Sequence, residues 1–273
     1  MTATVLRHPA VAGLFYPRDP TTLREEVNAY LTQTPEPNSV GALGCIVPHA
    51  GYVYSGHVAG AVFAALKVPE LCIVLCPNHT GRGQPLAIMS QGAWETPFGH
   101  VSIDADFADA LKRQCPLLRE DSTAHQAEHA AEVELPFLQM LQHKLKIVPI
   151  ALGAGQFEAL EQLGLALAEV IAARSSSALI VASSDMNHYE SDAITRVKDH
   201  IAIEPILRLD ARDLYDAVIQ QHISMCGFGP AVAMLTAAKS LGATVAELVK
   251  YATSGDISGE RSAVVGYAGI VVR

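Results

Sequence analysis

The sequence predicts an α/β fold, specifically a single-domain three-layer αβα sandwich around a mostly parallel or mixed sheet. Three observations lead to this prediction. Short apolar runs alternate along the chain with segments of helical pattern. Several of these runs lack polar alternation, which is typical of strands covered on both faces. The chain of 273 residues is 50% hydrophobic, which is enough apolar material for a sizeable core.

Seven apolar runs are the expected strands. They lie at residues 44–49, 71–77, 85–90, 145–152, 178–184, 244–252 and 262–272. The runs LCIVLCP and ALIVASS are apolar at most positions, so helices should cover both of their faces. The predicted sheet therefore lies in the middle of the molecule.

Eight segments have the pattern of helices. They lie at residues 19–31, 56–66, 104–114, 128–141, 157–173, 192–210, 211–222 and 229–242. Asp19 or Thr21 is expected to cap the first helix, and Gly242 to end the last. No internal repeat or long polar linker interrupts the pattern, and the serine run at 175–177 is too short to separate domains. We therefore predict one domain, residues 1–273.

Charge and composition exclude several classes of partner. A formal net charge of −9, no basic run and only 6% aromatic residues lack the footprint of a nucleic-acid-binding protein. The first residues lack the apolar core and cleavage site of a signal peptide. No apolar run approaches the roughly 20 residues of a membrane span. We expect a protein that acts on a small molecule, without nucleic acid or membrane.

The five cysteines favour a cytoplasmic location. Because they are odd in number and form no CxxC pair, neither a disulfide framework nor a four-thiolate zinc site is predicted. Cys45, Cys72 and Cys76 lie inside apolar runs, where a free thiol usually behaves as a small hydrophobic side chain. Cys226 differs, because it lies in the glycine-bounded loop SMCGFGP.

Residues suited to metal binding or catalysis follow several expected strands. His49 and His79 each follow one strand, Asp185 and His188 follow another, and Cys226 precedes the last long helix. In open α/β sheets, ligands gather at the carboxyl ends of the strands. His49 and His79 are 30 residues apart, the length of one strand-helix-strand unit, so we expect neighbouring strands and one shared metal ion. Alternatively, each histidine caps a helix or satisfies a turn.

The residues after His49 could complete such a site. Gly51 and Gly56 would let backbone approach closely, and Tyr52 or Tyr54 could supply a phenolic donor. The alternative is that these tyrosines are packing residues.

The motif SSDMNHY is a second group of candidate residues. Asp185 and His188 lie three residues apart in the turn after an expected buried strand. A histidine oriented by a carboxylate is a plausible acid or base. Alternatively, Asp185 or Ser184 caps the following segment, and His188 anchors the loop.

The segment EHAAEVELPFLQ adds three further candidates. Glu128, His129 and Glu132 are expected in the first turns of a helix, with the two glutamates on one face. The pattern lacks the second histidine of the HExxH zinc motif. Acidic residues are also favoured at helix N-termini for electrostatic reasons, which explains the glutamates without a site but explains His129 poorly.

Asp256 lies in a glycine-rich loop between the last two expected strands. It could reach the site or simply close a turn. No GxxxxGK[ST], GxGxxG or GxSxG motif occurs in a usable context, so nucleotide-binding and serine-hydrolase functions lack support.

Eight ordered motifs together resemble the Memo family, called AmmeMemoRadiSam system protein B in bacteria and archaea. The motifs are PAVAGLFYP, VPHAGYVYSG, CPNHTG, WETPFG, AEHAAEVELPFLQ, SSDMNHY, SMCGFGP and YATSGDISG followed by VVGYAGI. The resemblance runs from about residue 8 to the C-terminus. A Memo-like domain would therefore occupy almost the whole chain.

This resemblance implies a fold similar to the class III extradiol dioxygenases, which are non-heme iron enzymes. It implies that His49, His79 and Cys226 occupy metal-ligand positions, with Asp185 and His188 beside them. His188 would lie near the place of the dioxygenase acid/base. Cys226 stands where those enzymes have a carboxylate, and a thiolate is softer and shifts preference toward Cu(I) or zinc.

The leading functional prediction is a mononuclear metal centre, iron(II) or copper, performing oxygen or redox chemistry on an unidentified small molecule. One alternative is a non-catalytic adaptor or binding protein with a vestigial metal site. Another is a zinc-dependent hydrolase with His188 or Glu132 as base. The resemblance also implies radical-SAM and AMMECR1-like protein partners.

Overall fold

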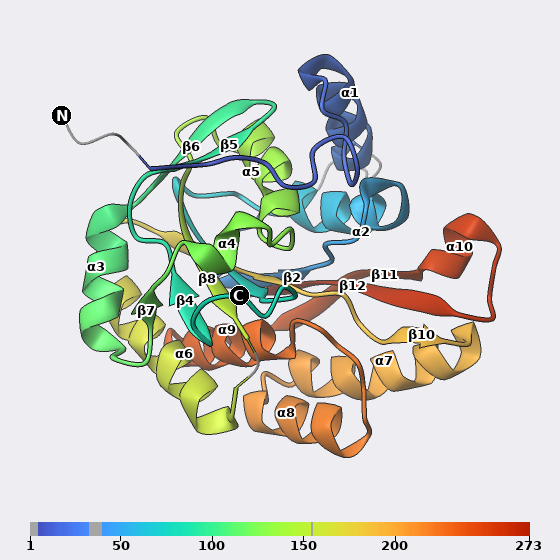
Figure 1. Cartoon of the computed structure of the whole chain (residues 1–273). Helices are drawn as coiled ribbons and strands as arrows, with labels where there is room; N and C mark the ends of the chain where they lie inside the picture. Colours follow the sequence, from blue (N-terminus) through green and yellow to red (C-terminus); the bar gives the residue numbers. More distant parts are fainter. Residues whose placement is uncertain (1–4, 33–39, 154) are drawn as a thin grey trace.

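In the part of the chain that the structure describes, twelve strands form one sheet, with the apolar runs among them (Figure 1). A computed structural model describes residues 5–32, 40–153 and 155–273. The strands are β1 (Leu6–Arg7), β2 (Gly44–Val47), β3 (Leu71–Pro77), β4 (Leu86–Ile88), β5 (Ala93–Thr96), β6 (Gly99–Ile103), β7 (Arg119–Glu120), β8 (Lys146–Leu152), β9 (Ala178–Ser183), β10 (His188–Glu190), β11 (Ala246–Thr253) and β12 (Val264–Val272). The predicted α/β class is therefore confirmed.

The centre of the sheet is parallel, and antiparallel pairs lie on both sides of it. The main strand order is β1-β5-β6-β8-β3-β9-β2-β12-β10. Strands β8, β3, β9 and β2 run parallel, whereas β12 pairs antiparallel with β2, β10 and β11. Every residue of β3 and β9 is buried, as their unbroken apolar sequences predict. The sheet is mixed, with its parallel strands in the interior.

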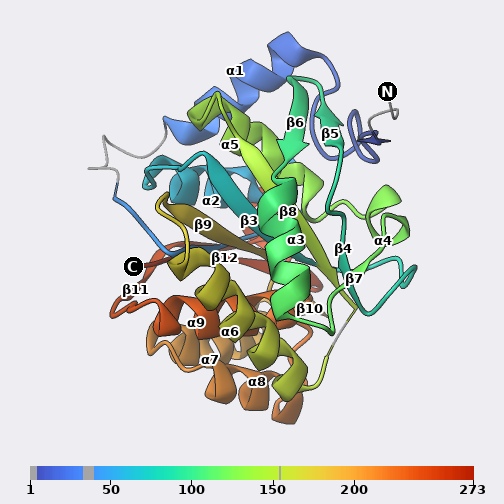
Figure 2. The ribbon, with the colours of Figure 1, turned by 90° about the vertical axis from the view of Figure 1, so that its left-hand side faces the viewer.

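Helices cover both faces of this sheet. They are α1 (Pro20–Leu31), α2 (Tyr52–Ala64), α3 (Ala105–Gln114), α4 (Thr123–Gln126), α5 (Leu135–Leu141), α6 (Phe157–Ala172), α7 (Asp192–Leu207), α8 (Ala211–Gln220), α9 (Phe228–Ser240) and α10 (Ser254–Ser258), with a 3₁₀ helix at Glu132–Glu134. Figure 2 shows α1, α2 and α5 on one side of the sheet and α6 to α9 on the other. The three-layer arrangement is confirmed.

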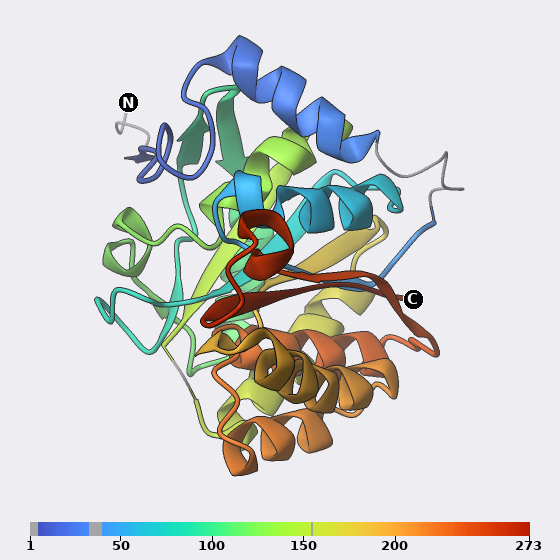
Figure 3. The same cartoon turned by 90° about the vertical axis from the view of Figure 1, so that its right-hand side faces the viewer.

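Two hydrophobic cores fill the spaces between the layers. One packs the sheet against α3, α6, α8 and α9 through residues such as Phe107, Leu163 and Leu235. The other packs the sheet against α1, α2 and α5 through residues such as Val27 and Phe137. Figure 3 shows α10 and the start of α2 side by side at one end of the sheet. Among the described residues, no helix has the length and apolarity that crossing a membrane requires.

The predicted helix boundaries are mostly correct at their starts and ends. Asp19 caps α1, because its side chain accepts a hydrogen bond from Thr22 N. Gly242 follows α9 with φ +96°, a left-handed conformation that favours glycine.

The helix predicted at residues 128–141 is wrong over its first turn. Helical structure begins only at the 3₁₀ helix, so Glu128 and His129 lie in the preceding loop. Glu128 and Glu132 therefore do not share a helix face. The carboxylate of Glu128 instead accepts hydrogen bonds from the His79 and Ala130 backbone N–H groups, which favours a loop conformation here.

The prediction that His49 and His79 follow neighbouring strands is also wrong. Strand β9 lies between β2 and β3 and pairs in parallel with both. The chain reaches β9 only much later, so sequence distance did not reveal its place. All three strands nevertheless end at the same edge because they are parallel, and the two histidines still approach each other there. The hairpin of β5 and β6, absent from the predicted strands, extends the opposite side of the sheet.

We expect Gly164→Ala to destabilise the fold. A Cβ atom at Gly164 of α6 would lie 2.6 Å from the Ala233 carbonyl oxygen of α9. Overpacking of this kind costs about 1–3 kcal/mol, although alanine is the better helix former. Urea unfolding of both proteins measures the difference. Gly41→Ala is the control, since a Cβ there has nothing within 4 Å. Equal unfolding midpoints for the two variants would contradict close packing of α6 on α9.

Candidate metal centre

The loops at the carboxyl edge of the sheet form a pocket of about 580 Å³. Its lining comes from the N-terminal loop, from the ends of β2, β3 and β9, from the loops before α5 and α9, and from β10 and β12. The lining residues are Phe15, His49, Ala50, Gly51, His79, His129, Asp185, His188, Tyr189, Ser224, Cys226 and Val265. Residues far apart in the sequence thus meet where ligands of α/β proteins usually bind.

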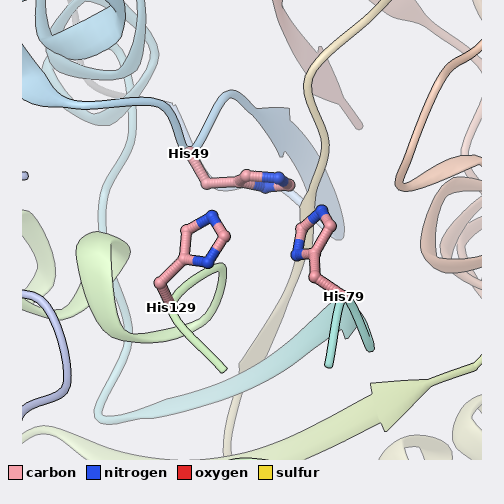
Figure 4. Close-up of side chains that lie close together, drawn as sticks. All are labelled: His49, His79 and His129. Atoms are coloured by element: carbon pink, nitrogen blue, oxygen red, sulfur yellow. The ribbon is translucent and has the colours of Figure 1, made fainter. Parts of the chain in front are cut away.

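Three histidines point toward one another in this pocket (Figure 4). One ligand nitrogen from each of His49, His79 and His129 lies within 4.8 Å of the other two. Among the described residues, no other group of three or more His, Cys, Asp or Glu side chains is arranged in this way. Their ring centroids are 4.8 to 5.5 Å apart. The cluster could hold one metal ion, because neutral imidazoles are common metal ligands.

Ser183 determines which nitrogen of His49 faces the pocket. Its hydroxyl lies 2.7 Å from the Ala130 carbonyl, which can only accept, and 2.8 Å from His49 Nδ1. Because the single hydroxyl proton satisfies the carbonyl, Nδ1 must carry the proton that it donates to Ser183. Nε2 of His49 then has a free lone pair. Burial, reinforced by the neighbouring histidines, holds the pKa of His49 well below its usual range, so the ring is neutral.

Glu128 determines which nitrogen of His79 faces the pocket, as Ser183 does for His49. Its carboxylate accepts from the His79 backbone N–H at 2.6 Å and interacts with ring Nδ1 at 2.9 Å. Nε2 of His79 is therefore left free for a metal. Burial alone would lower the pKa of His79, but the Glu128 carboxylate outweighs burial and raises it. Burial would raise the pKa of Glu128, but its hydrogen bonds from His79 and Ala130 lower it.

His129 is the third member of the histidine cluster. Its ring stacks on His79 with an interplanar angle of 17°, and its Nδ1 lies 3.5 Å from Glu128 Oε1. Burial lowers the pKa of His129 although Glu128 opposes this effect, so the neutral form is favoured. The sequence suggested a supporting role for His129. Its position instead makes it a direct candidate for metal binding.

Cys226 lies beside this cluster. Its Sγ is 3.3 Å from His49 Nε2 and 3.6 Å from the Asp185 carbonyl oxygen. Burial raises the pKa of the Cys226 thiol, so it is protonated without a cation nearby. Cys226 does not belong to the group of ligand atoms mutually within 4.8 Å. It is nevertheless near enough to His49 for both to bind one ion.

Asp185 and His188 both line the pocket, but Ser224, rather than Asp185, orients His188. The Ser224 carbonyl lies 2.9 Å from His188 Nδ1, and the Ser224 hydroxyl accepts from the His188 backbone N–H at 2.8 Å. Asp185 Oδ1 instead accepts from the His49 backbone N–H at 2.8 Å. Burial raises the pKa of Asp185 to about 7. Burial lowers the pKa of His188, which is neutral with a free Nε2.

Two residues singled out in the sequence, Glu132 and Tyr52, support the site from outside the pocket. Glu132 is fully buried, pairs with Arg7 and accepts a hydrogen bond from the Tyr16 hydroxyl at 2.6 Å. The Tyr52 hydroxyl donates to the Val133 carbonyl at 2.6 Å. Neither side chain lines the pocket. They fasten the segment that carries His129 to the N-terminal loop and to α2.

Two others lie away from the pocket lining. Asp256 forms a capping box with Thr253 at the start of α10 and pairs with Arg196. Of the two roles considered for Asp256, this position corresponds to closing a turn. Tyr54 is 40% exposed on the first turn of α2.

No sequence pattern marked three supporting residues. Ser183 and Ser224 orient His49 and His188, and Glu134 Oε1 lies 3.0 Å from Ser183 Oγ. Ser183 follows an apolar run and Glu134 lies in a predicted helix, so each resembles an ordinary strand-end or helix residue. Only the tertiary contacts reveal their roles.

The fold and site define an α/β protein with a candidate metal centre at the carboxyl ends of parallel strands. The family model described as Memo-like protein matches residues 7–271, and the chain belongs to this family. It is 40% identical to a MEMO1 family protein of Methanothermobacter thermautotrophicus, over 97% of this chain and 99% of that protein. It is 42% identical to one of Methanopyrus kandleri, over 98% and 99%. It is 41% identical to a MEMO1 family protein of Aquifex aeolicus, over 97% of this chain and 98% of that protein.

We expect Glu128→Gln to weaken metal binding about 10- to 100-fold, as is typical when a partner of a metal-binding histidine is lost. The amide cannot accept from the His79 ring and both backbone N–H groups as the carboxylate does. Calorimetric titration with Zn(II) measures the affinity. Glu120→Gln is the control, because Glu120 lies outside the pocket lining. Wild-type affinity in a folded Glu128→Gln protein would show that Glu128 does not organise the site.

Proposed function

We propose that this chain is a mononuclear metalloprotein that performs oxygen or redox chemistry on a small molecule. The observation that carries the proposal is the convergence of three imidazoles, each with a nitrogen available, on one point of an open pocket. His49 and His79 are the core of the proposed ligand set. Both are held by a second hydrogen bond on Nδ1, a typical arrangement for metal-binding histidines.

Cys226 is the proposed third ligand. Its 3.3 Å separation from His49 Nε2 suits two donors to one ion, since metal–nitrogen and metal–sulfur distances are about 2.0–2.1 Å and about 2.3 Å for zinc. A thiolate with two imidazoles favours copper or iron over hard cations such as magnesium. When bound, such a metal would supply redox chemistry and a site for oxygen. His129 lies within reach as an additional nitrogen donor.

The residues that line the pocket favour an uncharged, partly apolar substrate. Phe15, Tyr189 and Val265 line it, and no lysine or arginine does. An anionic substrate would therefore have no cationic side chain as a partner, only the proposed metal ion. His188 is proposed as the acid/base, because the Ser224 carbonyl keeps the proton on Nδ1 and leaves Nε2 to accept one.

Zinc-dependent hydrolysis is the second candidate. The three-histidine cluster favours it, since catalytic zinc often has three protein ligands and one open position. In this case His188 would act as base toward a water molecule. The radical-SAM and AMMECR1-like partners and the cytoplasmic location are further proposals, which rest on membership of the Memo-like family.

Metal content of ligand variants tests the proposed set. We expect His49→Ala and Cys226→Ser each to lose most bound metal while remaining folded, because these side chains lie at a loop edge and contribute little to the core. Elemental analysis of protein purified without chelator measures this, and it also distinguishes iron or copper from zinc. His129→Ala is the matched comparison. Loss of metal in His129→Ala with full retention in Cys226→Ser would reject the Cys226 assignment and favour the three-histidine zinc centre.

His188→Ala should leave metal bound but reduce turnover about 10²-fold or more, as expected for a positioned acid/base. Metal stoichiometry and oxygen uptake are measured on the same sample across a panel of uncharged catechols and thiols. Metal loss as complete as in His49→Ala would make His188 a ligand. A metal-loaded wild type without oxygen uptake would favour the hydrolase, and a wild type without metal would favour the adaptor.

A further inference from the structure

A fully buried carboxyl group lies directly behind His49. Glu134, at the end of the 3₁₀ helix, has no exposed surface. Its Oε1 is 3.0 Å from Ser183 Oγ, and its Oε2 has no hydrogen-bond partner. Ser183 is itself bound to His49 Nδ1. Glu134 is thus linked through one hydroxyl group to a proposed metal ligand, and it takes no part in the function described above.

The hydrogen bonds of Ser183 indicate the protonation state of Glu134. The hydroxyl has one proton but faces three groups: the Ala130 carbonyl, His49 Nδ1 and Glu134 Oε1. An ionised Glu134 and the Ala130 carbonyl would compete for that proton. If Glu134 Oε1 carries a proton, it donates to Ser183, Ser183 donates to Ala130, and His49 donates to Ser183. Every contact is then satisfied.

Burial acts in the same direction. It raises the pKa of Glu134 well above its usual range, and a hydrogen bond from Ser183 offsets this only in part. The ionisable groups that act on Glu134 are Asp185 beside β9, Cys45 in β2 and Tyr52 in α2. Burial keeps the Cys45 thiol and the Tyr52 phenol neutral, so no cation among these neighbours stabilises a carboxylate.

We propose that Glu134 is a positioning residue that gives up its proton when a cation binds at His49. This inference rests on the proposed metal site. A divalent ion with one thiolate leaves a net positive charge in a buried region, where an opposite charge nearby is strongly favoured. The O–H bond of Glu134 breaks, its proton is released to solvent, and the carboxylate remains. The Ser183 hydroxyl turns from Ala130 to Glu134, and His49 continues to donate to Ser183.

Proton release on metal binding tests this proposal. We titrate the metal-free protein with Zn(II) in buffers of different ionisation enthalpy and count the protons released per ion. We expect the wild type to release about one proton more than Glu134→Gln, and Glu134→Gln to bind about 10-fold or more weakly. The glutamine amide can still donate to Ser183, so the fold should persist. Glu120→Gln is the matched control, because it makes the same change from carboxylate to amide at a residue outside the pocket lining.

Infrared difference spectra of the wild type give a second measurement, which follows the carboxyl group directly. A protonated-carboxyl band should disappear when Zn(II) is added, and the same band should be absent from metal-free Glu134→Gln. Equal proton release by wild type and Glu134→Gln, or a band that persists with metal bound, would overturn the inference while leaving the metal site intact. A wild type that binds no Zn(II) would overturn both.

Discussion

The geometry of the site depends on one buried carboxylate. Glu128 accepts from the His79 backbone N–H, interacts with the His79 ring and accepts from Ala130 N–H, so a single side chain fixes the loop after β3 against the loop before α5. These loops carry His79 and His129, whose stacked rings make up two thirds of the histidine cluster. Arg7 strengthens the arrangement, because its guanidinium donates to the Glu128 and His125 carbonyls and pairs with Glu132. The N-terminal strand is thereby tied to the site.

Parallel strand pairing supplies the rest of the site. β2, β9 and β3 end together, so His49, Asp185 and His79 reach one edge although long stretches of chain separate them. Residues at strand ends are held by a rigid sheet, which limits their movement more than a free loop would. Cys226 comes instead from the loop before α9. Gly227 allows this, because a Cβ there would lie 2.3 Å from the Ser183 carbonyl oxygen.

Ligands of α/β proteins bind at the carboxyl ends of the strands, and this rule made much of the site predictable from sequence. The limits of the rule have physical reasons. Apolar runs identified β2, β3 and β9, and the polar residue after each run marked His49, His79 and Asp185. The insertion of β9 between β2 and β3 is a long-range pairing that no local pattern records. His129 was assigned to a helix because the acidic residues around it resemble a helix N-terminus, whereas the buried hydrogen bonds of Glu128 hold it in a loop. Partners such as Ser183 and Ser224 act only through tertiary contacts.

Glu128 and Glu134 lie close in sequence and are both fully buried, yet their pKa values shift in opposite directions. The difference comes from the number of donors. Glu128 receives hydrogen bonds from two backbone N–H groups and one imidazole, enough to replace the water lost on burial. Glu134 has one hydroxyl partner and an unpaired oxygen, so burial dominates and the neutral acid is favoured. The site thus places a permanent carboxylate behind His79 and a carboxyl group that responds to nearby charge behind His49. A cation bound by these two histidines would meet different electrostatic surroundings at each, so the two proposed ligands would be unequal.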